Sequence, residues 1–145
     1  MDYRDLKIYQ KPREVVQLLN KIMNSWPKTM QSQEIKRQLF RSATSIGANI
    51  AEGHGRHVGQ EYIHYLTIAQ GSANEVDHWL NTALDCGIGS AKELNNLISL
   101  NNETRKMLNA SINTLKKRRD NKIMHETPAP YAPIPYSPEN SEEKL

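Results

Sequence analysis

Residues 60–86 read QEYIHYLTIAQGSANEVDHWLNTALDC, and this stretch decides the fold of the chain. Apolar residues recur in it at steps of three and four, which places them on one face of an α-helix. The rhythm is similar to a coiled-coil heptad, in which one apolar seam faces neighbouring helices. The stretch therefore predicts a long helix whose buried stripe comprises Tyr62, Leu66, Ala69, Ala73, Val76, Leu80 and Leu84.

Three further segments, 6–23, 32–53 and 90–115, show the same helical periodicity, and none shows the strict alternation of a strand. Pro12 must either kink the first of these helices or mark its true first turn. Ser90, with a glutamate three residues later, predicts a capping box at the start of the last. The breaks between helices fall at residues that favour turns: Trp26-Pro27, Gly53, Gly55, Gly59, Gly87 and Gly89.

Four amphipathic helices joined by short loops predict an all-α fold, an antiparallel up-down four-helix bundle over residues 1–125. The stripe of the fourth helix is interrupted by Asn101 and Thr104, and its last apolar position is Leu115. Five of the seven prolines lie in residues 126–145, where they exclude both a helix and a central strand. We expect a disordered or polyproline-II tail there.

The charge and cysteine content narrow the class of protein. Residues 1–125 carry 18 basic against 12 acidic residues, a balance of +6, which favours an anionic partner such as RNA but serves solubility equally well. The single cysteine, Cys86, excludes an intramolecular disulfide and suits a reducing compartment. No stretch approaches the ~20 apolar residues of a membrane span, and no signal peptide begins at Met1. We expect a cytoplasmic protein that does not enter a membrane.

Two Glu-x-x-His motifs, Glu61–His64 and Glu75–His78, raise the question of a metal site. Di-iron bundles need this motif on two different helices that face inward, whereas these copies lie roughly 21 Å apart on one helix. We therefore favour solvated surface residues. Cys86 follows Asp85 at a helix end, where both the carboxylate and the dipole disfavour a thiolate. With no phosphate-binding glycine fingerprint either, the sequence predicts no enzyme, cofactor or metal.

The segment that begins at Arg41 carries a family signature. Residues 41–53 read Arg-Ser-Ala-Thr-Ser-Ile-Gly-Ala-Asn-Ile-Ala-Glu-Gly, and residues 71–75 read Gly-Ser-Ala-Asn-Glu. Together with Asp-Leu-Lys-Ile-Tyr-Gln at residues 5–10, these motifs closely resemble a bacterial four-helix-bundle family. That family was first noticed as open reading frames in intervening sequences of 23S ribosomal RNA genes, and its members are sometimes called S23 ribosomal proteins.

The resemblance implies a helical bundle that assembles into a ring-like homo-oligomer, a pentamer. A distant relative, the accessory protein of diversity-generating retroelements, is a basic pentamer that works with a reverse transcriptase and RNA. The present sequence does not closely resemble that accessory branch, so its role is not transferred. Because most members of the family have no established biochemical activity, the resemblance implies none for this chain.

Polar residues of the signature flank the apolar stripes of the second and third helices. We interpret them as a hydrogen-bonded network that fixes how these helices pair, with Gly47 and Gly71 permitting close approach. The alternative is a ligand site that grips phosphate through Arg41 and Arg56. The predicted network comprises Ser45, Asn49, Glu52, Glu61, Ser72 and Glu75.

A second apolar flank of the third helix holds Tyr65, Ile68, Trp79 and Ala83. It makes the apolar surface wider than an isolated bundle needs, and wide faces with Trp and Tyr are typical of subunit interfaces. Deeper packing within the monomer is the alternative. We favour an oligomer interface through Tyr65, Ile68 and Trp79.

The last feature is a basic run after Leu115, which comprises Lys116, Lys117, Arg118, Arg119 and Lys122. The helix there either projects beyond the bundle or frays, and Arg119 falls on the buried stripe if packing continues. Cations near a helix C-terminus are favourable for the dipole alone. The functional hypothesis is phosphate contact, multiplied around a ring, with RNA or a ribonucleoprotein as partner. No aromatic residue interleaves the run, so base stacking is not indicated, and a protein-interaction scaffold without nucleic acid is the alternative.

Overall fold

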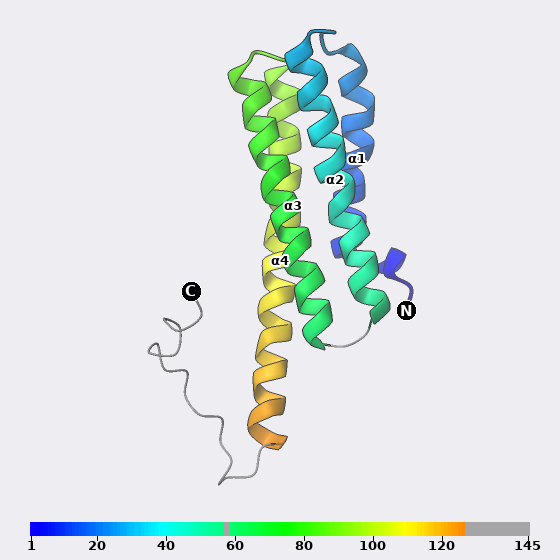
Figure 1. Ribbon diagram of the computed structural model, residues 1–145, viewed down its shortest axis with the longest axis vertical. Helices are drawn as coiled ribbons and strands as arrows, with labels where there is room; N and C mark the ends of the chain where they lie inside the picture. The colour runs from blue at the N-terminus through cyan, green and yellow to red at the C-terminus, as the bar shows by residue number, and fades with distance from the viewer. Residues whose placement is uncertain (57–58, 127–145) are drawn as a thin grey trace, which may run out of the picture.

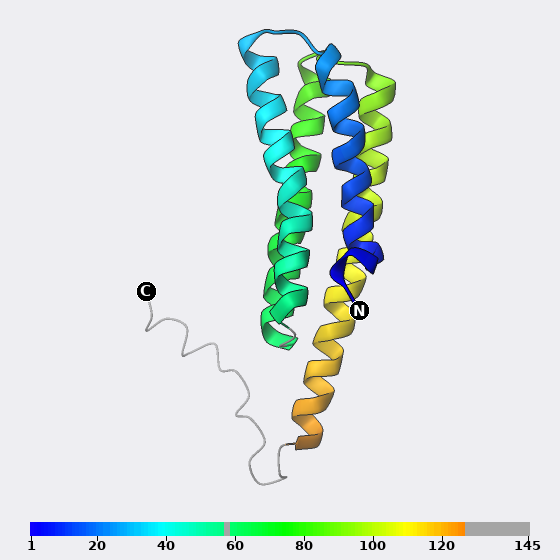
Figure 2. The same ribbon diagram turned by 90° about the vertical axis from the view of Figure 1, so that its right-hand side faces the viewer.

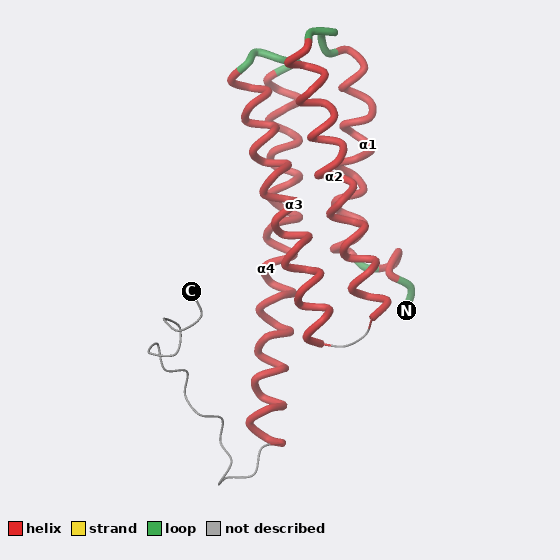
Figure 3. Tube along the Cα trace, in the orientation of Figure 1, coloured by secondary structure: helices red, strands yellow, loops and turns green. Residues whose placement is uncertain are grey.

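The computed structural model describes residues 1–56 and 59–126. Figures 1 and 2 show four long helices side by side, each running opposite to the one before it in the chain. No strand occurs in the part that the structure describes (Figure 3). The predicted all-α up-down bundle is confirmed. Its elements in chain order are η1 (Tyr3–Asp5), α1 (Lys7–Ile22), η2 (Met23–Ser25), α2 (Met30–Arg56), α3 (Gly59–Asp85) and α4 (Ala91–Glu126).

One apolar core runs along the bundle, built from stripes of all four helices. The predicted stripe of α3 is buried from Leu66 to Leu80, while Ile63 and Ala83 take the fully buried places that were expected for Tyr62 and Leu84. The apolar residues of α2 that recur at steps of three and four are all buried: Ile35, Leu39, Ala43, Ile46 and Ile50. In α2 and α3, helical periodicity therefore locates the core to within one residue.

The loops at one end of the bundle close over the core. Trp26 and Ile88 are 3% and 5% exposed, so both connecting loops contribute buried side chains. Gly87 and Gly89 have φ of 65° and 76°, a left-handed conformation that ends α3 as predicted. A Cβ on Gly89 would lie 2.5 Å from Nε1 of Trp26, so this glycine also makes room for the indole.

Side-chain caps start two of the helices. The backbone N–H of Glu93 donates to Oγ of Ser90 at 3.4 Å, which confirms Ser90 as the cap of α4. The predicted start of α2 at Ser32 is wrong by two residues. Thr29 accepts from the N–H of Ser32 at 3.2 Å, so Thr29 is the N-cap and Ser32 the third helical residue.

Pro12 neither ends nor begins a helix. It is buried in the second turn of α1, which begins at Lys7, and so it does not mark the first turn. Its ring lines a groove between α1 and α2 together with Tyr3 and Tyr9. Packing of the ring against a neighbouring helix offsets the backbone hydrogen bond that proline removes.

The prediction that α2 ends at Gly53 is wrong, because α2 continues through Gly55 to Arg56. Gly53 is buried, and a Cβ there would lie 2.7 Å from Cβ of Tyr65. This glycine therefore serves the close approach of α2 and α3 and does not terminate the helix.

The helix α4 continues past the last core position to Glu126, the first residue of the expected tail. The sequence from Lys116 to Glu126 contains neither glycine nor proline, and Pro128 ends the run of residues compatible with a helix. The prediction of a disordered or polyproline-II tail otherwise falls on residues 127–145, which lie outside the described residues.

Candidate nucleic-acid interface

The basic residues at the end of α4, Lys116, Lys117, Arg118, Arg119 and Lys122, are referred to below as the basic tip. Figures 1 and 2 show this end of α4 extending past the ends of α2 and α3. Nη1 of Arg119 donates to Oε1 of Gln60, the second residue of α3, at 3.1 Å. Residues 120–126 therefore extend about 10 Å beyond α3, at 1.5 Å per residue. The helix is continuous through this segment up to Glu126, as the projecting alternative requires.

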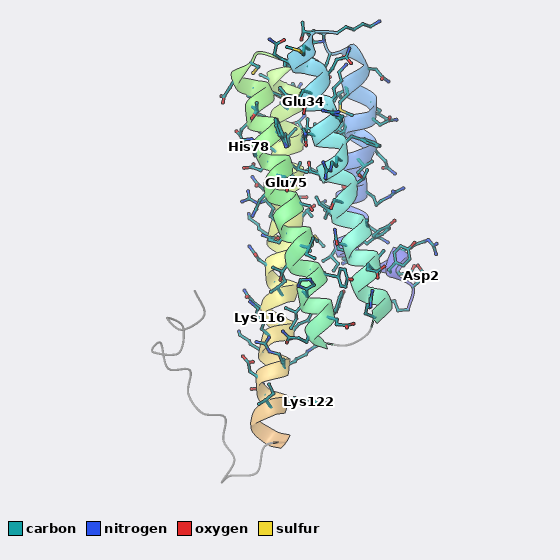
Figure 4. The ribbon with its side chains drawn as sticks, viewed as in Figure 1. Asp2, Glu34, Glu75, His78, Lys116 and Lys122 are labelled. Atoms are coloured by element: carbon teal, nitrogen blue, oxygen red, sulfur yellow. The ribbon has the colours of Figure 1, made fainter. Side chains whose placement is uncertain are left out.

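Three cations of the basic tip face solvent. Lys116, Lys117 and Arg118 are exposed, and none of them makes an ion pair with a residue in 1–56 or 59–126. Lys122 is also exposed, and Figure 4 places it beyond the end of α3. Lys116, Lys117 and Arg118 hold no carboxylate among the described residues and remain available to a phosphate, so these three side chains give the tip its positive field.

Arg119 has a different role from its neighbours. Its side chain is 34% exposed, and Nε donates to Oδ1 of Asp120 at 3.1 Å in addition to the bond to Gln60. It occupies the position on the stripe that the sequence predicted if packing continued. Arg119 thus fastens α4 to the start of α3 and presents less charge to a ligand than Lys116, Lys117 or Arg118.

Arg56 lies at the same end of the bundle, on α2, but a carboxylate already engages it. Its Nε and Nη2 donate to Oε1 of Glu52 at 3.1 and 2.9 Å, and the guanidinium lies 5.6 Å from the centre of the Tyr65 ring. The hydrogen bond to Glu52 and the negative charges of Glu52 and Glu61 raise the pKa of Arg56. The arginine is therefore held charged, but its charge is largely balanced.

Arg41 is exposed and precedes Arg56 by 15 residues on α2, which corresponds to about 22 Å. The structure therefore does not bring Arg41 together with the basic tip. Arg41 and Arg56 are therefore too far apart along α2 to grip one phosphate together, as the alternative interpretation of the signature required.

Three of the six predicted network residues form a hydrogen-bonded cluster between α2 and α3. The hydroxyls of Ser45 and Ser72 are 2.9 Å apart, and Nδ2 of Asn49 donates to the carbonyl and the hydroxyl of Ser45 at 2.8 and 3.1 Å. Ser72 is buried and the other two are half-buried. The cluster pairs the two helices, as the structural interpretation predicted.

The three glutamates of the predicted network do not bond to that cluster. Glu52 bonds to Arg56, and Glu61 acts on the same arginine through its charge. Glu75 is exposed and bonds to none of the described residues, since it lies about 60° further round α3 than Ser72. The carboxylates thus belong to the surface.

The glycine assignment within this motif needs correction. A Cβ on Gly71 would meet nothing within 4 Å, and one on Gly47 would lie 3.3 Å from Cε2 of Tyr9 on α1. Neither glycine is therefore needed for the approach of α2 to α3, which depends on Gly53 instead. The expectation failed because periodicity does not show which neighbour a helix face meets.

The flank predicted as an oligomer interface is partly used inside the monomer. Ala83 is fully buried, Trp79 packs against the core, and Tyr65 contacts the position of Gly53. Ile68 remains 39% exposed. The alternative of deeper packing thus accounts for much of this flank, and Ile68 is the apolar side chain it leaves on the surface.

The two Glu-x-x-His motifs lie on the surface of α3, where Glu61, His64, Glu75 and His78 are exposed. Figure 4 shows Glu75 and His78 of the second motif. Each imidazole meets the ring of the following residue edge to face: His64 with Tyr65 and His78 with Trp79. Within the described residues, no three of His, Cys, Asp and Glu gather in a way that could hold a metal ion.

The contact between α3 and α4 is polar at its centre, which the sequence indicated only as an interruption of the apolar stripe of α4. Asn101 and Thr104 interrupt the stripe of α4, and both are fully buried. Nδ2 of Asn101 donates to the carbonyl of Ala73 on α3 at 2.9 Å, while Oδ1 of Asn101 and Oγ1 of Thr104 bond to none of the described residues. A buried amide of this kind favours one register of two helices over others.

None of the described helices is long and apolar enough to span a membrane.

Comparison with known proteins gives a consistent picture. The model of the family described as 23S rRNA-intervening sequence protein matches residues 4–110. Among solved structures, a protein of unknown function from the S23 ribosomal protein family of Bacteroides thetaiotaomicron is 28% identical. The match has a TM-score of 0.61 and covers 72% of this chain and 97% of that one. No curated protein matches the chain.

Proposed function

This chain belongs to the family of 23S rRNA-intervening sequence proteins, and from that premise we propose that it is a non-enzymatic protein that binds RNA or a ribonucleoprotein through the basic tip. The observation that carries the proposal is the geometry of α4. Lys116, Lys117 and Arg118 are exposed, hold no carboxylate among the described residues and lie beside the start of α3, just before α4 leaves the bundle. Exposed cations at the end of the bundle can reach a polyanion without obstruction from the rest of the domain.

The proposed binding depends on phosphate and not on base edges. Lysine and arginine on an exposed helix contact the backbone of a nucleic acid, which positions the protein without reading sequence. Binding of this type releases condensed counterions and therefore weakens steeply as salt is added. The cytoplasm, where RNA is accessible and Cys86 stays reduced, is the compartment we assign.

We further propose that the protein acts as a homo-oligomer, a pentamer, which would multiply the basic tips presented to one RNA. Exposure of Ile68 on the aromatic flank of α3 supports an interface there. Native mass spectrometry of the full chain tests this. Ile68→Lys is expected to dissociate the oligomer, whereas Met30→Lys, at a residue that is 82% exposed, is the matched control and should leave it intact. A monomeric wild-type chain would overturn this part of the proposal.

RNA binding is tested by fluorescence anisotropy with a short single-stranded RNA across a series of salt concentrations. The test variant replaces Lys116, Lys117 and Arg118 with alanine. The matched control replaces three exposed cations in or beside the loops at the opposite end of the bundle, Lys21, Lys28 and Lys92. Both variants lose the same formal charge, so they separate a site at the tip from the net charge of the protein.

The expected result is micromolar or tighter binding that the control retains and the tip variant loses. If all three tip cations contact phosphate of a single strand, the slope of log K against log salt should fall in magnitude by about 2. Equal weakening in both variants would show that net charge alone attracts RNA. Absence of binding at low salt would leave the protein-interaction scaffold as the working hypothesis.

A further inference from the structure

A shallow groove lies between α3 and α4 directly beside the basic tip. Its volume is about 280 Å³. Drug-sized ligands occupy pockets of roughly 300–1,000 Å³, so this groove suits a smaller group. Its lining residues are Tyr62 from α3 and Ala110, Ser111, Thr114, Leu115 and Arg118 from α4.

The groove exists because α4 carries small side chains where it passes Tyr62. Ala110, Ser111 and Thr114 leave unfilled the space that larger apolar residues occupy along the rest of the α3–α4 contact. The groove is thus a consequence of the sequence of α4 just before its basic run.

Contacts with α2 hold the ring of Tyr62 in place. A Cβ on Gly53 would lie 3.0 Å from Cδ2 of Tyr62, so α2 packs directly against the ring. The ring also meets that of His54 edge to face, with centroids 6.3 Å apart. Burial raises the pKa of the Tyr62 phenol above its usual value of 10, so the ring stays neutral at physiological pH. A fixed, neutral aromatic ring is suited to stacking.

Arg118 supplies the opposite chemistry in the same groove. It is exposed and makes no ion pair with a described residue, and it follows Thr114 by one helical turn. Tyr62 and Arg118 are 56 positions apart in the chain, so only the antiparallel packing of α3 and α4 brings an aromatic ring to the basic tip. An aromatic platform beside a free cation is the combination with which proteins bind single-stranded nucleic acid.

We propose that this groove binds one unpaired base of single-stranded RNA, which stacks on Tyr62 while Arg118 contacts the adjacent phosphate. The proposal rests on the RNA binding proposed above and adds a preference to it. Bases in a duplex are stacked on one another and cannot enter the groove, so a duplex would contact only the cations of the basic tip.

The test compares a labelled single-stranded RNA with a hairpin duplex of similar charge, by anisotropy at constant salt, using the full chain. Tyr62→Leu removes the aromatic ring but keeps an apolar side chain against Gly53, and Tyr62→Phe keeps the ring. We expect Tyr62→Leu to weaken single-strand binding on the order of tenfold, with duplex binding unchanged and Tyr62→Phe close to wild type. Because stacking involves no counterion, the salt dependence of Tyr62→Leu should match that of wild type.

A second variant tests the groove independently, in case Tyr62→Leu does not fold. Thr114→Leu fills the groove from an exposed position on α4, so it is expected to fold and to cause the same selective loss. Equal binding of single strand and duplex by wild type, with no effect of either substitution, would overturn the stacking site while leaving RNA binding by the tip intact. If wild type binds neither probe, both proposals fail together.

Discussion

The two ends of the bundle are built on different principles. At one end the connecting loops cover the core with Trp26 and Ile88, and Gly89 adopts a positive φ beneath the indole. At the other end α4 continues past its neighbours and carries charge into solvent (Figure 1). Burial of apolar area stabilises the closed end. The open end gains little from packing and is free to carry residues that serve a partner.

Glycine illustrates the same contrast. Gly89 at the closed end is required by the backbone, because its φ of 76° is rarely adopted by other residues. Gly53 at the open end is helical and is required by its neighbour, because Tyr65 occupies the space of a side chain. The two glycines are thus required for different physical reasons, one by the backbone and one by a neighbouring side chain.

The largest expected effect on stability comes from a substitution in the core of the closed end. Trp26→Ala removes a side chain that is 3% exposed and leaves a cavity, so the free energy of unfolding should fall by about 3–5 kcal/mol. Urea denaturation followed by circular dichroism measures this. The matched substitution at the open end, Ile123→Ala, concerns a residue that is 44% exposed and should change stability by less than about 0.5 kcal/mol. Similar losses for both would refute the difference between the ends.

The next effect concerns close approach of α2 and α3. Gly53→Ala forces a Cβ into Tyr65 and should destabilise the protein by about 1–3 kcal/mol. Gly71→Ala, in an open and helical position, should stabilise it by about 0.5–1 kcal/mol, because alanine favours the helix. Thermal unfolding of the two variants should show changes in stability of opposite sign. A stabilising Gly53→Ala would mean that the helices are further apart at this end.

A smaller effect is expected between the two ends, where Thr104 is buried. Its hydroxyl bonds to none of the residues that the structure describes, so it is desolvated without compensation. Thr104→Val keeps the shape and removes the hydroxyl, and it should raise the free energy of unfolding by about 1 kcal/mol. Denaturant titration is the measurement. A loss of stability would indicate that the hydroxyl has a partner in solution, such as a buried water.

The smallest effect on stability is expected for the exposed cations at the open end. Replacing Lys116, Lys117 and Arg118 with alanine should change the free energy of unfolding by less than about 0.5 kcal/mol, because these side chains are exposed and bury nothing. The same thermal scan used for the glycine variants measures it. A large destabilisation would assign these residues to folding and weaken the case for a binding surface.

Much of the fold follows from local pattern. The stripe from Leu66 to Leu80, the cap at Ser90 and the breaks at Gly87 and Gly89 were all predictable, because each depends on residues within a few positions of one another. Predictions that depended on the neighbouring helix were less accurate. Gly53 was interpreted as a helix end and Gly71 as a close contact between helices. In the structure Gly53 is the close contact, and Gly71 meets no neighbouring side chain.

The candidate site shows the same division. The basic run itself is visible in the sequence, and so is its place at the end of a helix. The engagement of Arg56 by Glu52 could have been anticipated from their spacing of four residues on one helix. The separate role of Arg119 was not visible, because it depends on a hydrogen bond to Gln60, 59 positions earlier.

The sequence by itself thus determined four amphipathic helices, their approximate ends, the core stripes and a basic segment, since periodicity and capping are local properties. Only the tertiary structure decided which helices touch at Gly53, that Asn101 bonds across to Ala73, and that Tyr62 lies beside Arg118. These contacts join residues that are far apart in the chain, and the register between antiparallel helices sets them. That register depends on how side chains of different helices fit together, which no single segment encodes.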